Sequence, residues 1–253
     1  MSIDEGFRLM LLAWIGLAPA IALVLLRIAA PYGRHNAKSA GPTVPAGIGW
    51  FLMELPALLI FPTLVIAMGT ASASPSLLML LALWLLHYGN RVLVYPWRVK
   101  SGSPMPLVIM LSSIAFNGIN GVFLGLGLTG LGGPSAIESI VDIRVVLGAI
   151  IFLGGFALNL QSDSVLRRLR MDGRPGYRVP TGWAYRFVSC PNYLGELLEW
   201  VGWAIASWSL PGLAFALWTA ANLVPRALAH HRWYLRTFPD YPAGRKAVLP
   251  GLL

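Results

Sequence analysis

The chain has little charge, a single cysteine and no long polar segment. Only 11% of its 253 residues are charged, whereas about a quarter is usual for a soluble domain. Cys190 is the only cysteine, so neither an internal disulfide nor a thiolate metal site can form, and we expect a small buried residue there. With 57% hydrophobic residues, the composition excludes an ordinary soluble domain and favours a lipid bilayer as the solvent.

Apolar runs recur at lengths that match a bilayer. They predict seven transmembrane helices, at about residues 7–28, 47–70, 76–97, 105–130, 144–162, 193–209 and 212–232. We interpret the first run as a retained helix and not as a signal peptide, because it follows acidic residues and ends at Arg27. The sequence therefore predicts an all-α integral membrane protein that forms one polytopic domain over residues 1–253.

A net charge of +9 would suggest a nucleic-acid partner, but the distribution of the charge argues against one. On the predicted topology, every lysine and arginine except Arg8 and Arg144 lies on one side of the membrane. The positive-inside rule then places the N-terminus outside and the C-terminus in the cytosol. Several of these cations also lie in motifs where an anionic cofactor would dock. We predict no nucleic-acid partner.

The last two predicted helices carry polar stripes that a lipid-facing helix would exclude. The members of each stripe recur at helical spacing and share a face. They are Asn192, Glu196 and Glu199 in one helix, and Arg226, His230 and Tyr234 in the other. A carboxylate at the bilayer centre costs roughly 3 kcal/mol on insertion scales, which makes these residues functional candidates. We expect the two helices to close around a polar ligand.

A further polar stripe ends the fifth predicted helix. Asn159 and Asp163 lie four residues apart, so an amide and a carboxylate share one face. Asp163 could bind amide or ribose hydroxyl groups, while Arg170 and Arg178 could bind phosphates. Tyr177 could stack on a cofactor. The loop that follows is long for a compact bundle and is typical of a functional lid; a solvated basic loop is the alternative.

The early helices hold candidates for catalysis. Glu54 lies in an apolar run before Pro56, where burial would favour its neutral form as a donor to a carbonyl oxygen. Tyr88 could offer a phenol proton to a developing oxyanion, and Arg91, three residues on, could reach a phosphate or a nicotinamide. The alternatives are a structural carboxyl group at Glu54 and interfacial positions for Tyr88 and Arg91.

Two other motifs carry no chemistry in our interpretation. Residues 125–130, GLGLTG, fit the dinucleotide fingerprint G-x-G-x-x-G, which requires a preceding strand. Here the motif ends a membrane-spanning run, so we interpret it as small-residue helix packing and a turn. His230 and His231 point about 100° apart on a helix, and no further His or Cys is spaced to complete a metal site. We predict no metal.

Several separated motifs, in order, carry a resemblance to a known family. They are WFLMELP (50–56), LHYGNR (86–91), NLQSDSVLRRLR (159–170), PNYLGELLEW (191–200), GWAIASWSLP (202–211) and RALAHHRWYLRTFPDYPAGRKAVLP (226–250). From about residue 32 onward, the chain resembles the membrane steroid 5α-reductases. One departure is Met53, where the family commonly has Gln.

The resemblance implies NADPH-dependent reduction of the C4=C5 double bond of a 3-oxo-Δ4-steroid or a related lipid enone. It implies hydride transfer to C5, with Glu54 and Tyr88 polarising the C3 ketone. Cofactor binding would fall to Arg34, Arg91, Asn159, Asp163, Arg170, Tyr177, Arg178, Asn192, Glu196, Arg226, His230 and Tyr234.

The same resemblance implies a division of the domain and a place in the cell. Residues 1–100 would serve mainly the steroid, and residues 101–253 mainly the cofactor. The protein would be a monomer among membrane lipids, in the inner or plasma membrane if the host is bacterial. Its cofactor site would face the cytosol.

Two other classes stay open on the sequence alone. Membrane isoprenylcysteine-type methyltransferases have a similar Pro-Asn/His-Tyr-Gly-Glu pattern and bind S-adenosylmethionine, but they lack the ELP and HYGNR elements at this spacing. A non-catalytic transporter would also bury charges in the membrane. An inverted repeat would favour the transporter, and the sequence has no convincing repeat.

Overall fold

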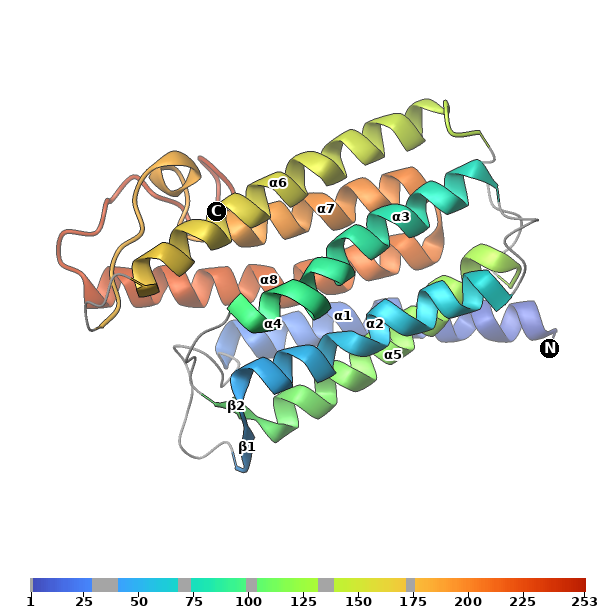
Figure 1. The fold of residues 1–253 in the computed structure, drawn as a ribbon, viewed down its shortest axis with the longest axis horizontal. Helices are drawn as coiled ribbons and strands as arrows, with labels where there is room; N and C mark the ends of the chain where they lie inside the picture. Colours follow the sequence, from blue (N-terminus) through green and yellow to red (C-terminus); the bar gives the residue numbers. More distant parts are fainter. Residues whose placement is uncertain (1, 29–40, 68–73, 99–103, 132–138, 172–175) are drawn as a thin grey trace.

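The computed structural model describes residues 2–28, 41–67, 74–98, 104–131, 139–171 and 176–253. Its long helices (Figure 1) are α1 (Ile3–Arg27), α2 (Ala46–Ala67), α3 (Pro75–Gly89), α5 (Leu107–Thr129), α6 (Ile143–Met171), α7 (Pro191–Ser207) and α8 (Leu210–Thr237). The short elements are β1 (Thr43–Val44), the π-helix η3 (Asn90–Val94), α4 (Tyr95–Arg98), β2 (Met105–Pro106) and the 3₁₀-helix η4 (Trp183–Arg186). β1 and β2 pair as an antiparallel ribbon.

Every predicted transmembrane helix falls on one of these long helices, the third on α3 together with η3 and α4. Within the described residues, five helical segments are long and apolar enough to cross a membrane, namely α1, α2, Pro75–Arg98, α5 and α6. The prediction of an all-α membrane protein is therefore confirmed. α7 and α8, which carry polar stripes, are not among the five, so seven crossings and the orientation stay predictions.

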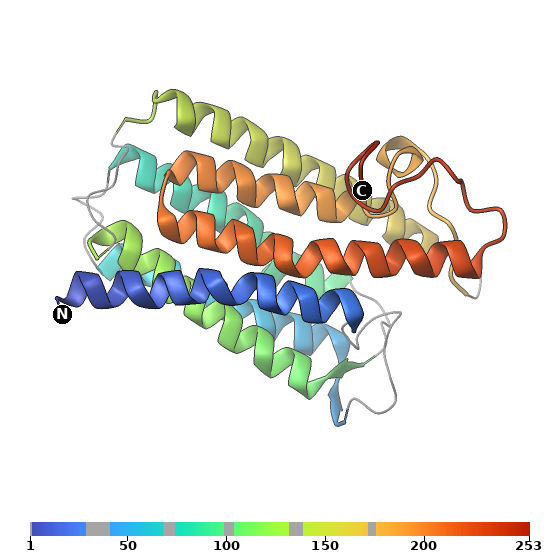
Figure 2. The ribbon, with the colours of Figure 1, turned by 180° about the vertical axis from the view of Figure 1, so that it is seen from behind.

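The helices run alternately along the bundle, and the N-terminus lies at the end opposite the segment that follows α8 (Figure 1). The main packing partners are α6 with α7, α2 with α5, α1 with α8 and α7 with α8. Seen from behind, α1 lies along α8, so the first and last helices are neighbours (Figure 2). α8 therefore packs against both α1 and α7, which places part of its surface inside the bundle.

α6 and α7 approach each other closely because glycines face each other across the interface. A Cβ atom at Gly155 would lie 2.5 Å from the Gly195 oxygen, and one at Gly202 would lie 2.5 Å from the Gly148 oxygen. On each helix the two glycines are seven residues apart, which is about two turns and keeps them on one face. Small residues let helix backbones meet in this way. The contact brings the polar stripes of α6 and α7 together.

The GLGLTG segment packs against neighbouring helices, as its small residues predict. A Cβ at Gly125 would lie 2.4 Å from Leu64 of α2, and one at Gly127 would lie 2.4 Å from Pro211 of α8 and 3.2 Å from Phe7 of α1. The segment lies at the end of α5, so that helix, and not a strand, leads into it. The interpretation as small-residue packing is confirmed.

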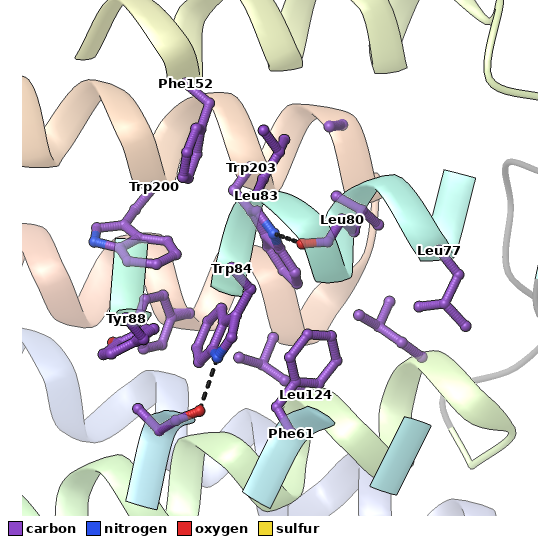
Figure 3. Close-up of a cluster of buried hydrophobic side chains, with 14 of the residues drawn as sticks. Phe61, Leu77, Leu80, Leu83, Trp84, Tyr88, Leu124, Phe152, Trp200 and Trp203 are labelled. Atoms are coloured by element: carbon purple, nitrogen blue, oxygen red, sulfur yellow. Dashed lines mark hydrogen bonds between the residues drawn. The ribbon is translucent and has the colours of Figure 1, made fainter. Parts of the chain in front are cut away.

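Aromatic rings fill the space between α2, α3, α7 and α8 (Figure 3). Trp84 and Trp203 are fully buried. Their indole N–H groups donate to backbone oxygens, Trp84 to Ala57 at 2.8 Å and Trp203 to Leu80 at 3.1 Å. A buried indole needs such a partner. These bonds tie α3 to α2 and α7 to α3.

The segment after α8 folds back onto the start of α7. The Ser189 N–H donates to the Lys246 oxygen at 2.8 Å. The Ser189 hydroxyl oxygen lies 2.6 Å from His231 Nδ1 and 2.6 Å from the Tyr241 hydroxyl. Cys190 is buried, as expected from the sequence. This network holds the C-terminal segment against the first turn of α7.

Candidate active site

A cavity of about 860 Å³ lies among α2, α3, α5, α6, α7 and α8. Its volume is in the upper part of the usual range for ligand and cofactor sites, about 300–1,000 Å³. Its aromatic wall includes Trp50, Phe116, Trp200, Phe215 and Trp218, and its cations are Arg91, Arg98, Arg167, Arg170 and Arg226. The cavity can therefore offer surfaces to both an apolar and an anionic ligand.

Most of the predicted site residues line this one cavity. They are Glu54, Tyr88, Arg91, Asn159, Asp163, Arg170, Tyr177, Asn192, Glu196, Arg226, His230 and Tyr234. Arg178 is not part of the wall; its guanidinium donates to the Leu169 backbone oxygen at the end of α6. Arg34 lies outside the described residues. The helical spacing thus brings together residues from five helical segments of the chain, while Arg170 and Arg178 do not form a fork at the wall.

Glu54 has a cation beside it, which corrects the expectation of a lone carboxyl group. Arg91 Nη2 donates to Glu54 Oε1 at 3.0 Å, and Asn117 Nδ2 lies 3.3 Å from Glu54 Oε2. Asn117 Nδ2 also donates to the Met53 oxygen at 2.6 Å. A carboxyl oxygen can accept hydrogen bonds from a guanidinium and from a side-chain amide. Both oxygens of Glu54 are therefore engaged by neighbouring donors in the wall.

A local π-helix sets the position of Arg91. Tyr95 N–H bonds to the Asn90 oxygen across five residues, and the next residue is Pro96, which has no N–H to continue the ladder. π-helical turns of this kind are frequent at functional sites. The Arg91 guanidinium stacks on Trp50 at 4.7 Å and on Tyr95 at 4.9 Å. These contacts support the cation from two sides.

A chain of amide groups joins α6 to α7. Asn159 Nδ2 donates to the Asn192 oxygen at 3.0 Å, and Asn192 Nδ2 donates to Asp163 Oδ1 at 3.1 Å. Glu196, one turn further along α7, also lines the cavity. The chain depends on the close glycine contact of the two helices. It leaves carboxylate and amide oxygens at the wall that can accept hydrogen bonds from a ligand.

The polar stripe of α8 is held by Tyr193 of α7. Arg226 Nε donates to the Tyr193 hydroxyl at 2.7 Å, and that hydroxyl lies 3.2 Å from His230 Nε2. The rings of Tyr193 and His230 are stacked, with 28° between their planes. Tyr234 stacks on Tyr241 of the C-terminal segment with 12° between the planes. Contacts within the chain therefore hold the stripe in position.

The donor set of the cavity fits an anionic dinucleotide. The arginines of the wall outnumber the carboxylates Glu54, Asp163 and Glu196, and arginine binds phosphate well. Arg91 Nε is buried and has no hydrogen-bond partner in the described part of the chain, so a donor is available there. In the same residues, no group of three or more His, Cys, Asp or Glu could hold a metal ion.

The structure adds wall residues that the sequence analysis did not select. They include Trp50, Tyr95, Tyr193 and Asn222. Asn222 could have been found, because it lies four residues before Arg226 and extends the same stripe. The others carry no signal of their own, since aromatic residues are common both in cores and at membrane interfaces.

The fold and the cavity together define the class of protein. The protein is an all-α membrane protein whose helices enclose a cavity with an aromatic wall and several arginines. A family model described as 3-oxo-5-alpha-steroid 4-dehydrogenase matches residues 103–253. The chain belongs to this family.

Individual relatives align with this chain over nearly its whole length. Steroid 5-alpha-reductase DET2 of Arabidopsis thaliana is 39% identical over 255 residues, covering 96% of this chain and 95% of the relative. The 3-oxo-5-alpha-steroid 4-dehydrogenase 1 of Bos taurus is 38% identical over 260 residues, covering 100% of both. The human 3-oxo-5-alpha-steroid 4-dehydrogenase 2 is 39% identical over 236 residues, covering 91% and 92%. The family excludes the methyltransferase and transporter alternatives.

Proposed function

We propose that this protein reduces the C4=C5 double bond of 3-oxo-Δ4-steroids, or of related lipid enones, with NADPH. Family membership and the names of its relatives support the reaction. The observation that carries the proposal is the common wall of Tyr88, the Glu54–Arg91 pair and the arginines in one cavity. A bound NADPH would supply the hydride that C5 of the enone accepts.

Tyr88 and the Glu54–Arg91 pair are the proposed catalytic groups. When C5 accepts a hydride, negative charge moves to the ketone oxygen, and donors aimed at that oxygen lower the barrier. The Tyr88 hydroxyl is one such donor. Glu54 orients Arg91 through their hydrogen bond, and Arg91 Nε–H, which has no partner among the described residues, offers a second donor. The enolate then takes up a proton at C4, from the Tyr88 hydroxyl or from water, which completes the reduction. Hydride transfer requires the nicotinamide and the enone to meet, so the role expected of Arg91 toward the cofactor is compatible with this position.

The proposed cofactor site uses the polar residues of α6, α7 and α8. The Asn159–Asn192–Asp163 chain would hold amide or hydroxyl groups, and Arg170 and Arg226 would bind phosphates. Glu196, His230, Tyr234 and Tyr177 would complete the site, with Arg34 and Arg178 as further candidates. The excess of arginine favours NADPH over NADH, because the former carries an additional phosphate.

The proposed site has one dry and one wet side. An apolar steroid would enter from the lipid between the early helices, and the cofactor would enter from the basic end of the bundle, which faces the cytosol under the positive-inside rule. The early helices would serve mainly the steroid and residues 101–253 mainly the cofactor. We propose that a monomer suffices, because a single chain encloses the cavity.

The test is NADPH oxidation by the purified protein in detergent, with a panel of enones. The panel contains a progesterone-like steroid, a sterol with a different double bond, and a polyprenyl or fatty enone. Reduction of the 3-oxo-Δ4-steroid would support the proposal. An active preparation should bind NADPH, so binding of S-adenosylmethionine instead, or the absence of turnover with every enone, would refute it.

Tyr88→Phe tests the proposed donor and has a matched control. Loss of one oxyanion donor should lower kcat about 100- to 1,000-fold. Tyr95→Phe removes a hydroxyl from the same wall but keeps the ring that stacks on Arg91, so kcat should change less than about threefold. Equal effects of both substitutions would remove Tyr88 from its proposed role.

A further inference from the structure

His87 of α3 and Glu199 of α7 form a buried acid–base pair behind the cavity wall. His87 Nδ1 lies 2.7 Å from Glu199 Oε2. The two residues are only 2% and 0% exposed, and neither belongs to the cavity wall. Within the described residues, Glu199 Oε1 has no hydrogen-bond partner. Burying such groups costs desolvation energy, and an apolar pair of similar volume is often at least as stable. Stability alone therefore does not explain the pair.

The pair contacts two aromatic residues of the adjacent cavity wall, Tyr88 and Trp200. His87 directly precedes Tyr88, and Glu199 directly precedes Trp200. The His87 ring meets Tyr88 edge-on at 4.9 Å and Trp200 edge-on at 4.7 Å. The rings of Tyr88 and Trp200 lie 5.7 Å apart, and Figure 3 shows both beside Trp84. Movement of His87 would therefore be transmitted to both wall residues.

Tyr88 needs such support because its own backbone leads into the π-helix. α3 ends at Gly89 and η3 begins at Asn90, so the usual helical hydrogen bonds change directly after Tyr88. An oxyanion donor is effective only when it is held at the correct place. A displacement of about 1 Å can cost about 100-fold in rate. The His87–Glu199 bond fixes this end of α3 to α7 at the position where the donor is required.

We propose that His87 and Glu199 are positioning residues for the Tyr88 hydroxyl. The inference depends on the proposed function, because it assumes that Tyr88 acts on the ketone. It assigns a role to two ionisable residues that touch neither ligand. The pair acts through ring contacts and through the hydrogen bond between α3 and α7.

The first experiment compares Glu199→Leu with Glu199→Gln in the full-length protein. Leu removes the oxygen that shares the hydrogen bond with His87, whereas Gln retains an oxygen and an N–H₂ group that can replace it. E199L should lower kcat about 10- to 100-fold, and E199Q should lower it less than about threefold. The Kd for NADPH, measured by titration without steroid, should stay within about threefold of wild type in both.

Trp203→Phe is the matched control for general destabilisation. It breaks another buried hydrogen bond between the same helices, from Trp203 Nε1 to the Leu80 oxygen at 3.1 Å, and Trp203 does not line the cavity. W203F should lower thermal stability but leave kcat within about threefold of wild type. If W203F loses as much kcat as E199L, the effect follows stability and the positioning role is wrong.

The double substitution His87→Phe with Glu199→Leu tests whether kcat falls because Tyr88 is displaced or because one polar partner is left buried without the other. It leaves neither partner unpaired, so thermal stability should return toward that of wild type, while kcat stays low. Recovery of kcat in the double variant would overturn the inference. This comparison, together with E199Q, still decides the question if E199L does not fold.

A binding measurement provides a readout that does not depend on turnover. A saturated 3-oxo-steroid cannot be reduced at C4=C5, but its ketone can still accept from Tyr88. Its binding, followed by tryptophan fluorescence, should weaken in E199L and not in W203F; equal affinities in E199L and wild type would contradict the inference. If wild type reduces no enone, the proposed function fails; if wild type is active and E199L retains its kcat, only the positioning role fails.

Discussion

Gly155→Ala tests the contact that brings the two polar helices together. A Cβ atom at Gly155 would lie 2.5 Å from the Gly195 oxygen and 2.7 Å from the Glu199 nitrogen. Both neighbours are backbone atoms, which cannot rotate away. Because Cβ atoms essentially never approach within 3.0 Å of another atom, α6 and α7 would have to separate by at least about 0.5 Å, the difference between 3.0 and 2.5 Å. The substitution therefore acts on the interface and not on one side chain.

Gly154 supplies a matched control, and general substitution energies give the expected change in stability. Overpacking a tight contact costs about 1–3 kcal/mol, whereas replacing a mid-helix glycine by alanine stabilises a helix by about 0.5–1 kcal/mol. Gly155→Ala should therefore be destabilising by up to about 2 kcal/mol after the two effects are combined. At Gly154 a Cβ meets no atom within 4 Å, so Gly154→Ala should be neutral or stabilising by up to about 1 kcal/mol.

Unfolding of both variants in detergent, followed by circular dichroism, measures the difference. NADPH titration should show weaker binding for G155A, because separation of the helices lengthens the Asn159–Asn192 hydrogen bond of 3.0 Å. G154A should bind NADPH as wild type does. If G155A is as stable as G154A and binds NADPH equally well, the glycine contact does not hold the site together.

The other predictions concern single charges. Glu54→Gln should lower kcat about 100-fold by releasing Arg91 while the Kd for NADPH changes less than about threefold; an equal loss of NADPH affinity would contradict this division of labour. Arg226→Ala should weaken NADPH binding about 10- to 100-fold, because it removes a hydrogen bond to a charged group, and unchanged affinity would remove Arg226 from the site. At the start of α6, hydrogen bonds from Arg144 lower the pKa of Asp142 from 3.8 to about 2. Asp142 therefore stabilises the fold above its unfolded pKa and loses that contribution as the pH falls toward 2. The difference in thermal midpoint between wild type and Asp142→Asn should be constant from about pH 7 to 5 and vanish near pH 2. A difference that stays constant down to pH 2 would show that ionisation of Asp142 does not affect stability.

The helices and the polar stripes could be predicted because each depends on spacing within one segment. Apolar length marks α1, α2, α5 and α6. An i, i+4 spacing puts Asn159 beside Asp163, and the structure places both at the cavity. Arg178 has the same residue type as Arg170 but follows the helix, so no periodicity could fix its direction, and it bonds to Leu169 instead.

Contacts between helices could not be predicted in the same way. The glycines of α6 and α7 are each visible in the sequence, but their pairing depends on the register of two helices that meet only in the fold. The π-helix at Asn90–Val94 is another case. Pro96 indicates that a hydrogen bond is missing, but a kink, a helix end or a π-turn would each satisfy that condition.

Glu54 shows why the sequence near a buried residue does not reveal its partners. Desolvation alone favours a neutral carboxyl group, and the residues next to Glu54 in the sequence offer no cation. The cation comes from Arg91 of η3, 37 positions further along the chain, whose guanidinium lies 3.0 Å from the carboxyl oxygen. In the proposed mechanism, the second donor to the ketone is therefore Arg91, which Glu54 holds. If Glu54 acts by orienting Arg91 as proposed, Glu54→Asp should also lower kcat, because the shorter side chain no longer reaches the guanidinium, which lies 3.0 Å from Glu54.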